Sequence, residues 1–509
     1  MSPLVAFIIN AGVQGMGAAL CTWVPMIAWL YPGADVLTGS IIGALFLVPF
    51  ALVYVLFSIS MPRSGGDYVW TSRVLGPRIG YMLSFSFTLW LVILIGMLYP
   101  IQASYFSSVF AMLAIGFGYA PMNVWAQLLM TPMWLFAYTI VMTLICFLMV
   151  AFGVKYASVV MKVLFFLTIL GEAVVFGVLI FSSREAFANG FNHLSSIPYD
   201  AVIDTAKTAG FVGPPANLAA TMSSIAAIFM MYYGFTFSVY VAGEIKDVKK
   251  SMWVSMFGVL IGGIITIGGG AFLIYRLAGF EWFQALSNLF FSYPANYPLP
   301  APPWVYYVAL MGTDIQILWT IAGIAFIALI LLWPIGPVMV ASRTLFAWSF
   351  DRIAPTILAD VNPRYKSPFK ALALIFGVAF VVSCIYIFTT VFTWFANVTL
   401  AFSLAAIIPC IAAIVYPRRK EYDDSAAKPF RIGNVPLISI CGVIALFVQI
   451  FISYNAYATP AISGPVGYPA LSLIVLSFVL GPLLFEASRR YHLKKEALDI
   501  SLSFKEIPP

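Results

Sequence analysis

Three stretches of this 509-residue chain contain no Asp, Glu, Lys or Arg: 79–154, 371–417 and 432–485. Each is longer than the roughly 20 residues that an α-helix needs to cross a bilayer. The composition agrees, because 62% of the residues are hydrophobic and 9% are charged, against about 45–50% and about 25% in soluble domains. A segment in lipid has to satisfy its own backbone hydrogen bonds, as a helix does. The sequence therefore predicts an all-α polytopic membrane protein.

Twelve apolar segments fit the length of a membrane span. They lie near 4–30, 36–60, 79–113, 132–153, 157–182, 218–243, 251–277, 315–342, 369–389, 391–416, 435–457 and 468–486. Basic residues gather on the cytoplasmic side of membrane proteins. Alternate connections hold most of the 26 Lys and Arg residues, and only Arg184, Lys207 and Arg276 fall in the other set. We therefore expect a multi-pass protein of the cell membrane with both termini in the cytoplasm.

Several classes of function are unexpected for this sequence. The five cysteines lie in apolar segments without a CxxC spacing, which favours packing roles over disulfides or zinc. His193 and His492 lie outside the spans, so no span supplies a pair of haem ligands. No Walker motif or nucleophile–base arrangement appears. We expect no enzyme, metal site, cofactor or nucleic-acid partner, and the net charge of +7 reflects the loops.

Glycine interrupts two of the predicted spans. The first contains Gly12, Gly15 and Gly17 around its middle, and the sixth contains Gly234 between aromatic residues. Gly-interrupted segments in corresponding positions of two halves indicate a transporter site, because unwound backbone survives at membrane depth only where it lines a cavity. A half-helix that starts near Gly15 presents free N–H groups to a carboxylate.

Free carbonyl groups near Tyr232 and Tyr233 would suit an ammonium group, and a ligand that carries both groups is an amino acid. The alternative is that the glycines mark close helix packing, as in small-xxx-small seams. For Gly12 and Gly15 taken alone, the two interpretations are about equally probable.

Three further segments point to a known family. Residues 60–69 read Ser-Met-Pro-Arg-Ser-Gly-Gly-Asp-Tyr-Val and continue to Gly76-Pro77. Residues 242–247 read Ala-Gly-Glu-Ile-Lys-Asp after Gly234-Phe235, and residues 341–347 read Ala-Ser-Arg-Thr-Leu-Phe-Ala before Ala354-Pro355. In order and spacing the chain resembles amino acid permeases of the amino acid–polyamine–organocation superfamily.

The resemblance implies a five-plus-five inverted repeat of the leucine-transporter type that works by alternating access. It divides the chain into a first repeat (1–182), an outer loop (183–217), a second repeat (218–416), two accessory spans (417–487) and a cytoplasmic tail (488–509). The substrate site would lie between the breaks in spans 1 and 6. Its expected residues are Gln14, Gly15, Met16, Gly17, Ala18, Tyr232, Tyr233, Gly234, Phe235 and Thr236.

The chain departs from the family pattern at two points. Thr236 stands where many members have Glu, and Ala18-Ala19 replaces a bulky apolar pair. A weakly charged site favours a neutral or apolar amino acid as the substrate. We expect a secondary active transporter, coupled to protons or working by exchange. The alternatives are a transport-dead amino acid sensor or partner subunit of the same fold and, last, a membrane-embedded enzyme subunit.

Two ionisable residues lie well inside a predicted span, Lys162 and Glu172, and such residues are usually functional. Ten residues separate them, which is about 15 Å along a helix, so we expect no direct pair. Lys162 resembles a lysine that occupies a cation position in sodium-independent members, and the alternative is a side chain that snorkels to the interface. Glu172 is either a proton relay or a buried, protonated structural group.

Gating residues are expected at three positions. Two prolines should kink the eighth span at Trp333-Pro334-Ile335-Gly336-Pro337, and the resemblance places a gating element near Trp333 and Pro337. Trp394 is a further candidate. Packing or interfacial roles are the alternative for these aromatic residues.

Overall fold

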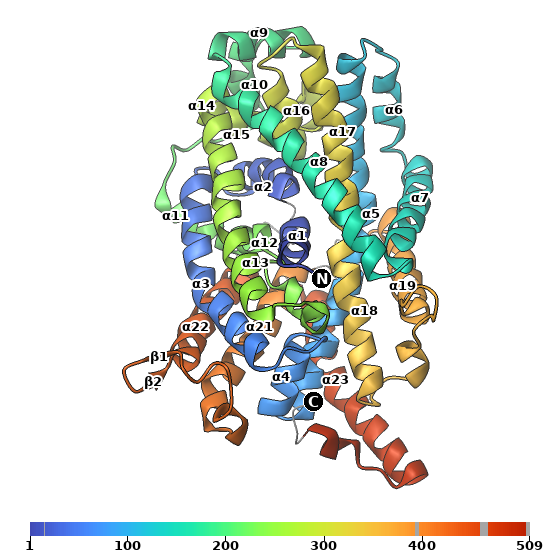
Figure 1. The fold of residues 1–509 in the computed structure, drawn as a ribbon. Helices are drawn as coiled ribbons and strands as arrows, with labels where there is room; N and C mark the ends of the chain where they lie inside the picture. Colours follow the sequence, from blue (N-terminus) through green and yellow to red (C-terminus); the bar gives the residue numbers. More distant parts are fainter. Residues whose placement is uncertain (15, 392–396, 459–466, 505–509) are drawn as a thin grey trace.

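The computed structural model describes residues 1–14, 16–391, 397–458 and 467–504, without the side chain of Met16. Almost all of this part is helical (Figure 1), and eleven of its helices are long and apolar enough to cross a membrane. They are α1 with α2 (Pro3–Gln14, Met16–Leu30), α3 (Val36–Ser60), α5 (Pro77–Gly116), α7 (Pro132–Ala151), α8 (Val154–Phe181), α13 with the π-helix η3 and α14 (Val248–Gly263, Ile264–Gly268, Gly269–Ala278), α17 with α18 (Gln316–Leu332, Ile335–Phe350), α19 (Phe369–Phe388), α21 with η6 (Val398–Val415, Tyr416–Arg418), α22 (Leu437–Ala458) and α23 (Tyr468–Glu496).

The sixth predicted span is discontinuous. It consists of α11 (Leu218–Ser223), α12 (Ile225–Met231) and the 3₁₀-helix η2 (Phe237–Glu244). No single piece is long enough to cross a bilayer, which is why eleven helices stand where the sequence predicts twelve spans. An interruption also separates α17 from α18 at Trp333-Pro334.

The first helix lies in the middle of the bundle (Figure 1). It contacts α13, α8, α18 and η2, and 88% of the apolar window of the first span is buried. A helix that is apolar all round is stable only when other protein or lipid surrounds it completely. The first span is therefore an internal element rather than a lipid-facing one.

Short helices cover one end of the bundle, which we call the α9 end. They are α6 (Met122–Leu128), α9 (Arg184–Leu194), η1 (Tyr199–Ala201), α10 (Val202–Ala209), α15 (Phe280–Ser292), η4 (Pro294–Asn296) and α16 (Val305–Leu310). The indole of Trp282 in α15 is buried between Phe187 and Phe191 of α9, at 5.4 and 5.0 Å between ring centroids. This aromatic contact fixes α15 and α9 against each other.

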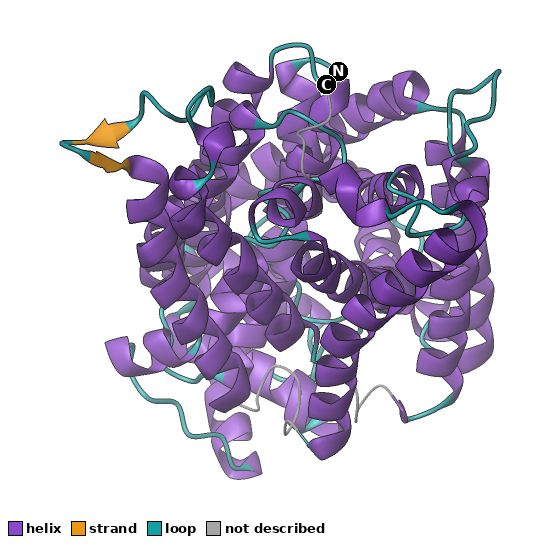
Figure 2. Cartoon of the chain, turned by 90° about the horizontal axis from the view of Figure 1, so that it is seen from below, coloured by secondary structure: helices purple, strands orange, loops and turns teal. Residues whose placement is uncertain are grey.

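The opposite end, which we call the α4 end, carries the C-terminus and is viewed from below in Figure 2. Its elements are α4 (Asp67–Val74), η5 (Thr356–Ala359), η7 (Lys420–Tyr422), the hairpin of β1 (Arg431–Ile432) and β2 (Val435–Pro436), and η8 (Ile500–Phe504). The last long helix, α23, continues to Glu496, beyond the predicted end of the span at 486. Residues with high helix propensity and the i,i+4 ion pair Arg490–Glu486 (3.4 Å) stabilise this extension of the helix.

Candidate functional site

The interruptions of spans 6 and 8 meet around one side chain of span 1, Val13. Gly234 has φ +93°, and a Cβ atom there would lie 2.2 Å from Val13 Cγ1. A Cβ atom on Gly336, just after the interruption of span 8, would lie 1.9 Å from Val13 Cγ2. Both contacts are shorter than any real Cβ contact, and a positive φ also disfavours other residues. Glycine at these two positions therefore lets the two irregular segments pack against α1.

Asn10 of α1 stabilises the unwound backbone of the sixth span. Its Nδ2 donates to the carbonyl oxygen of Phe235, and its Oδ1 accepts from the N–H of Ser238 at 2.6 Å. Backbone groups that leave a helix at membrane depth need such partners. The sequence analysis did not single out this residue. An amide inside an otherwise apolar span is the signal that points to it.

Gln14 and Tyr232 pack against the seventh span at Gly263, directly before its π-helical turn η3. A Cβ atom on Gly263 would lie 2.5 Å both from Gln14 Nε2 and from Tyr232 Cε1, so both side chains rest on this glycine. The Tyr232 hydroxyl donates to the carbonyl oxygen of Ser40 at 2.9 Å. Single π-turns often mark functional sites. The glycines of the seventh span are the sequence feature that could have indicated this close contact.

A cavity of about 410 Å³ lies beside the breaks, on the side of Tyr233 toward α15. None of its described lining residues is charged. It brings together five predicted site residues: Gln14, Ala18, Tyr233, Trp333 and Pro337. The other lining residues are Val13, Ala19, Thr22, Trp23, Met26, Leu94, Ile95, Met97, Leu98, Ile101, Ser104, Tyr105, Met230, Phe291, Trp304, Tyr386, Val398 and Thr399.

Two polar groups of this cavity have no partner among the described residues. They are the side-chain amide of Gln14, at both Oε1 and Nε2, and the hydroxyl of Tyr233. Gln14 is 4% exposed. A buried polar group without a hydrogen bond costs about 1–3 kcal/mol, and most such groups find a partner. These groups are therefore the ones available to a ligand in the cavity.

The other predicted site residues fall into three groups. Gly234, Phe235 and Thr236 line a second cavity of about 40 Å³, which Tyr233 also lines. The Tyr232 carbonyl, predicted to be free, accepts from the Phe235 N–H at 3.2 Å. Gly15, Trp394 and the side chain of Met16 lie outside the described part of the chain.

Glu172 lies behind the break in the first span. It is 6% exposed, and its Oε1 has no partner among the described residues. A Cβ atom on Gly17 would lie 3.1 Å from that oxygen and 2.8 Å from the hydroxyl of Tyr306, which also lacks a described partner. Glu172 also lines a small cavity of about 10 Å³ with Ala11 and Gly12. The carboxyl group thus faces the start of α2 from the side opposite the large cavity.

Lys162 is half-buried on α8, ten residues before Glu172. It does not line any of these three cavities. The described residues give its ammonium group neither a hydrogen bond nor an ion pair. The structure therefore does not bring Lys162 together with the other predicted site residues.

Tyr233 and Asp67 close the route from the large cavity toward the α4 end. The Tyr233 ring stacks on Phe402 at 4.4 Å between centroids. On the far side of the small cavity, Asp67 accepts from the hydroxyls of Tyr54 (2.9 Å) and Tyr240 (2.8 Å). Burial raises the pKa of Asp67 to about 6, although the hydrogen bonds from Tyr240 and Tyr54 lower it. The sequence analysis did not assign a function to Asp67.

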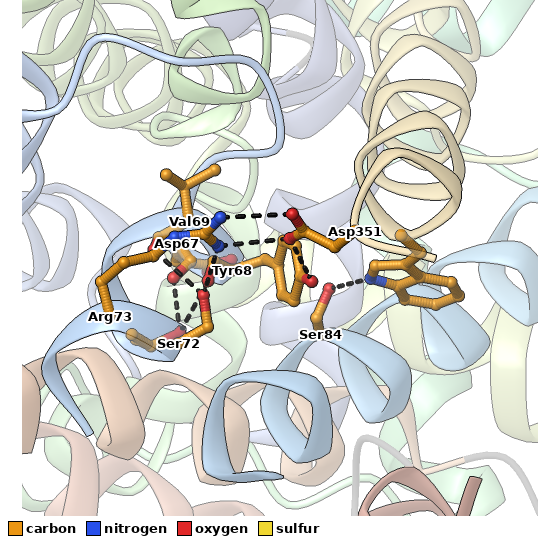
Figure 3. A network of polar contacts seen from close by, with 9 residues as sticks. Asp67, Tyr68, Val69, Ser72, Arg73, Ser84 and Asp351 are labelled. Atoms are coloured by element: carbon orange, nitrogen blue, oxygen red, sulfur yellow. Dashed lines mark hydrogen bonds and ion pairs between the residues drawn. The ribbon is translucent and has the colours of Figure 1, made fainter. Parts of the chain in front are cut away.

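Two ion pairs join α18 to the neighbouring elements at the α4 end. Arg73 contacts Asp351 at 3.3 Å, and the hydroxyl of Tyr68 donates to the same carboxylate at 2.6 Å (Figure 3). Arg343 donates to Glu244 at 2.9 Å and thereby joins α18 to the end of η2. Both arginines are nearly buried, and such charges are stable only when paired. The contacts tie α4, η2 and α18 together on this side of the cavity.

Comparison with known families identifies the chain. Residues 4–479 match the family model described as amino acid permease. This range includes the irregular segment of span 6, the 410 Å³ cavity and the ion pairs Arg73–Asp351 and Arg343–Glu244. No curated protein matches the chain. The protein therefore belongs to the amino acid permease family of the amino acid–polyamine–organocation superfamily, whose members are membrane transporters of amino acids and not enzymes.

Proposed function

We propose that this permease is a secondary active transporter that carries a neutral, apolar amino acid across the cell membrane by alternating access. The observation that carries the proposal is the 410 Å³ cavity, which Gln14, Ala18 and Tyr233 line and which has no charged residue in its described lining. A charged substrate side chain would lose its hydration there without finding a counter-charge, which is costly. An apolar side chain gains from the same surroundings.

The proposed contacts to the amino acid's own charged groups come from the breaks. A break at Gly15, which lies outside the described residues, would direct the next N–H groups and a positive dipole end at the carboxylate. The Gln14 amide and the Tyr233 hydroxyl, both without described partners, supply further hydrogen bonds. We place the substrate's side chain against Ala18 and Trp333 in the apolar part of the cavity.

Uptake into proteoliposomes tests the substrate class. Labelled leucine, methionine and phenylalanine should accumulate or exchange, whereas arginine and glutamate should not. Transport confined to arginine or glutamate would contradict the neutral cavity as the determinant. Binding of a neutral amino acid without any uptake or exchange would instead identify a sensor or partner subunit of the same fold.

We propose further that Glu172 carries the coupling proton. Its carboxyl group faces Gly17 at the start of α2, so its charge would act directly on the element proposed to bind the substrate carboxylate. Protonation of Glu172 removes a negative charge next to that carboxylate and favours substrate binding. Lys162 has no described polar partner, and we assign it the supporting role of a fixed positive charge in span 5.

The variant Glu172→Gln tests this coupling. It should abolish accumulation driven by a pH gradient and preserve exchange of substrate across the membrane, because glutamine is a permanent mimic of the neutral acid. Glu185→Gln, in the exposed first turn of α9, is the matched control and should accumulate substrate like the wild type. Unchanged accumulation in Glu172→Gln would refute the relay, and uptake driven by sodium alone would refute proton coupling.

The distribution of Lys and Arg supports an orientation with the α4 end, and therefore both termini, in the cytoplasm. In that orientation the contacts of Tyr233, Asp67 and Asp351 close the inner route. We propose that residues 1–182 and 218–416 move relative to each other as the two repeats when that route opens.

A further inference from the structure

A second large cavity near the α4 end lies apart from the 410 Å³ cavity and shares no described lining residue with it. Its volume is about 680 Å³, and it lies between the start of α8 and the loop that joins α18 to α19. The α8 side contributes Gly153, Val154 and Lys155, and the loop contributes Arg364, Tyr365 and Lys366. The remaining lining residues are Ser64, Phe152, Glu244, Ser342, Arg343, Phe346, Val361 and Pro368.

The two walls of this cavity approach each other through their backbones. A Cβ atom on Gly153, which has φ +91°, would lie 2.1 Å from the carbonyl oxygen of Tyr365. The Asn362 side chain accepts from the N–H groups of Arg364 (3.0 Å) and Tyr365 (3.1 Å), and the Lys366 N–H donates to the Asn362 carbonyl at 2.8 Å. These bonds order the loop internally, and the close approach of Gly153 and Tyr365 places its two basic residues beside the start of α8.

The cavity carries an excess of positive charge. Among the described residues, Lys155, Arg364 and Lys366 have no carboxylate partner. Glu244 is the one acidic residue in the described lining, and both of its oxygens accept from Arg343. The first N–H groups of α8 also face this region, and Gly153 provides no side-chain cap. Three cations and a positive helix end therefore meet at one place where the one described carboxylate is already paired with Arg343.

Other basic residues in and next to the α18–α19 connection do have carboxylate partners. Arg352 pairs with Glu496 at 3.0 Å, and Lys370 pairs with Asp360 at 2.6 Å. Basic residues on the same loop thus have carboxylate partners where they lie away from the cavity. The charge excess is confined to the residues that line it.

The mouth of the cavity coincides with the start of a lipid-facing surface. Phe152 and Tyr156 are 40% and 47% exposed, and the Phe152 ring contacts the rings of Tyr156 (5.6 Å) and Tyr365 (5.2 Å). Aromatic residues favour the headgroup level of a bilayer. Exposed apolar side chains then continue along one face of α8 at helical spacing: Val159, Val163, Phe166 and Leu170.

We propose that this cavity binds the phosphate headgroup of an anionic phospholipid, with the acyl chains along the exposed face of α8. Arg364 and Lys366 contact the phosphate from the loop, and Lys155 contacts it from the helix. Clusters of basic residues next to membrane spans attract anionic lipids, with about 1 kcal/mol for each Lys or Arg near the surface. Phosphatidylcholine has no net negative charge and lacks this attraction.

Native mass spectrometry of the detergent-purified protein with equal amounts of phosphatidylglycerol and phosphatidylcholine tests the proposal. The wild type should retain phosphatidylglycerol preferentially. The double variant Arg364→Gln/Lys366→Gln should retain roughly thirtyfold less of it, which follows from two basic residues. The control variant Arg418→Gln/Lys420→Gln makes the same charge change on another exposed loop of this end and should behave like the wild type.

Three results would overturn the proposal. One is equal retention of both lipids by the wild type, and a second is undiminished retention of phosphatidylglycerol by the Arg364→Gln/Lys366→Gln variant. The third comes from thermal unfolding: if inorganic phosphate raises the midpoint as much as phosphatidylglycerol does, the ligand is a free phosphate and not a lipid. The midpoints of both variants without lipid control for misfolding.

Discussion

At the scale of single residues, Val13 shows why glycine occurs where it does. Its two methyl groups occupy the positions that Cβ atoms of Gly234 and Gly336 would need. Both positions lie at or next to interruptions of apolar helices, where glycine breaks no regular helix and a larger residue would clash.

Gly234→Ala should destabilise the protein by about 2 kcal/mol or more, because alanine combines a positive φ with a steric overlap. The measurement is the thermal midpoint in detergent, with substrate exchange as a second readout that should be lost. Gly377→Ala is the control, since no atom lies within 4 Å of its Cβ position in α19. That variant should be unchanged or slightly more stable. Equal midpoints for the two variants would contradict the role of Gly234.

Asp67 makes the stability of the protein depend on pH with a defined sign. Its pKa is raised from 3.8 to about 6, so the folded protein holds a proton that the unfolded chain releases above pH 4. The free energy of unfolding should therefore fall as pH rises from about 4 to about 6, by up to about 3 kcal/mol, and show no further change from this group above pH 6.

Denaturant titrations of wild type and Asp67→Asn at several pH values measure this effect. The free-energy difference between the two should change between pH 4 and 6, and the wild type should lose stability relative to the variant. Asp360→Asn, an exposed carboxylate, should run parallel to the wild type across the same range. A constant difference between wild type and Asp67→Asn would show that Asp67 does not titrate in this window.

Some site residues were predictable from the sequence and others were not. Gly234 and Glu172 could be identified from the sequence. A glycine or a carboxyl group inside an apolar span costs free energy, whichever residues it contacts. Asn10 and Asp67 act through partners far along the chain, Phe235 and Tyr240. A single sequence contains no signal for such pairings, so their roles emerge only from the fold.

At the scale of elements, the short helix η8 shows how the C-terminal segment is attached. Phe504 is 4% exposed, lies 6.0 Å from Phe485 of α23 and has the Arg73 guanidinium 4.7 Å above its ring. Arg489 holds Asp499 at 2.8 Å. The segment therefore packs directly on the side chain that forms the ion pair with Asp351.

Phe504→Ala should release this segment while leaving the bundle folded, because η8 contributes little to the rest of the core. Limited proteolysis should cut within residues 497–504 several times faster than in the wild type, a change that corresponds to about 1 kcal/mol or more of local stability. Leu502→Ala, at an exposed position of the same helix, is the control. If both variants are cut at the wild-type rate, Phe504 does not anchor the segment.

Hydropathy predicted the ends of a helix where the helix is continuous. It did not predict them where contacts with other helices interrupt the helix. Spans such as Val36–Ser60 match their prediction closely, since a bilayer sets their length. The sixth span was predicted from 218 to 243 with a break at Gly234, and it divides into α11, α12 and η2. The division between α11 and α12 was not predicted, and the backbone around Gly234 contacts Asn10 and Val13 of another helix.

At the scale of the whole molecule, the described structure has an asymmetric arrangement around the large cavity. Toward the α4 end lie Tyr233, Asp67 and the ion pairs of Arg73 and Arg343. Toward the α9 end, the cavity is lined by Phe291 of α15 and by Trp304. One end is thus held by ion pairs, which have to break together for that end to open.

Substrate binding in the 410 Å³ cavity is tested most directly by a variant that fills this cavity. Ala18 is 2% exposed and lines it, so Ala18→Trp would occupy the volume in which we place the substrate. Ala173→Trp, on the exposed face of α8, controls for the added indole. The measurement is exchange of a labelled neutral amino acid, such as leucine, in proteoliposomes. Ala18→Trp should abolish exchange, with a thermal midpoint close to that of Ala173→Trp, while the control exchanges at the wild-type rate. Exchange at the wild-type rate by folded Ala18→Trp would contradict substrate binding in this cavity.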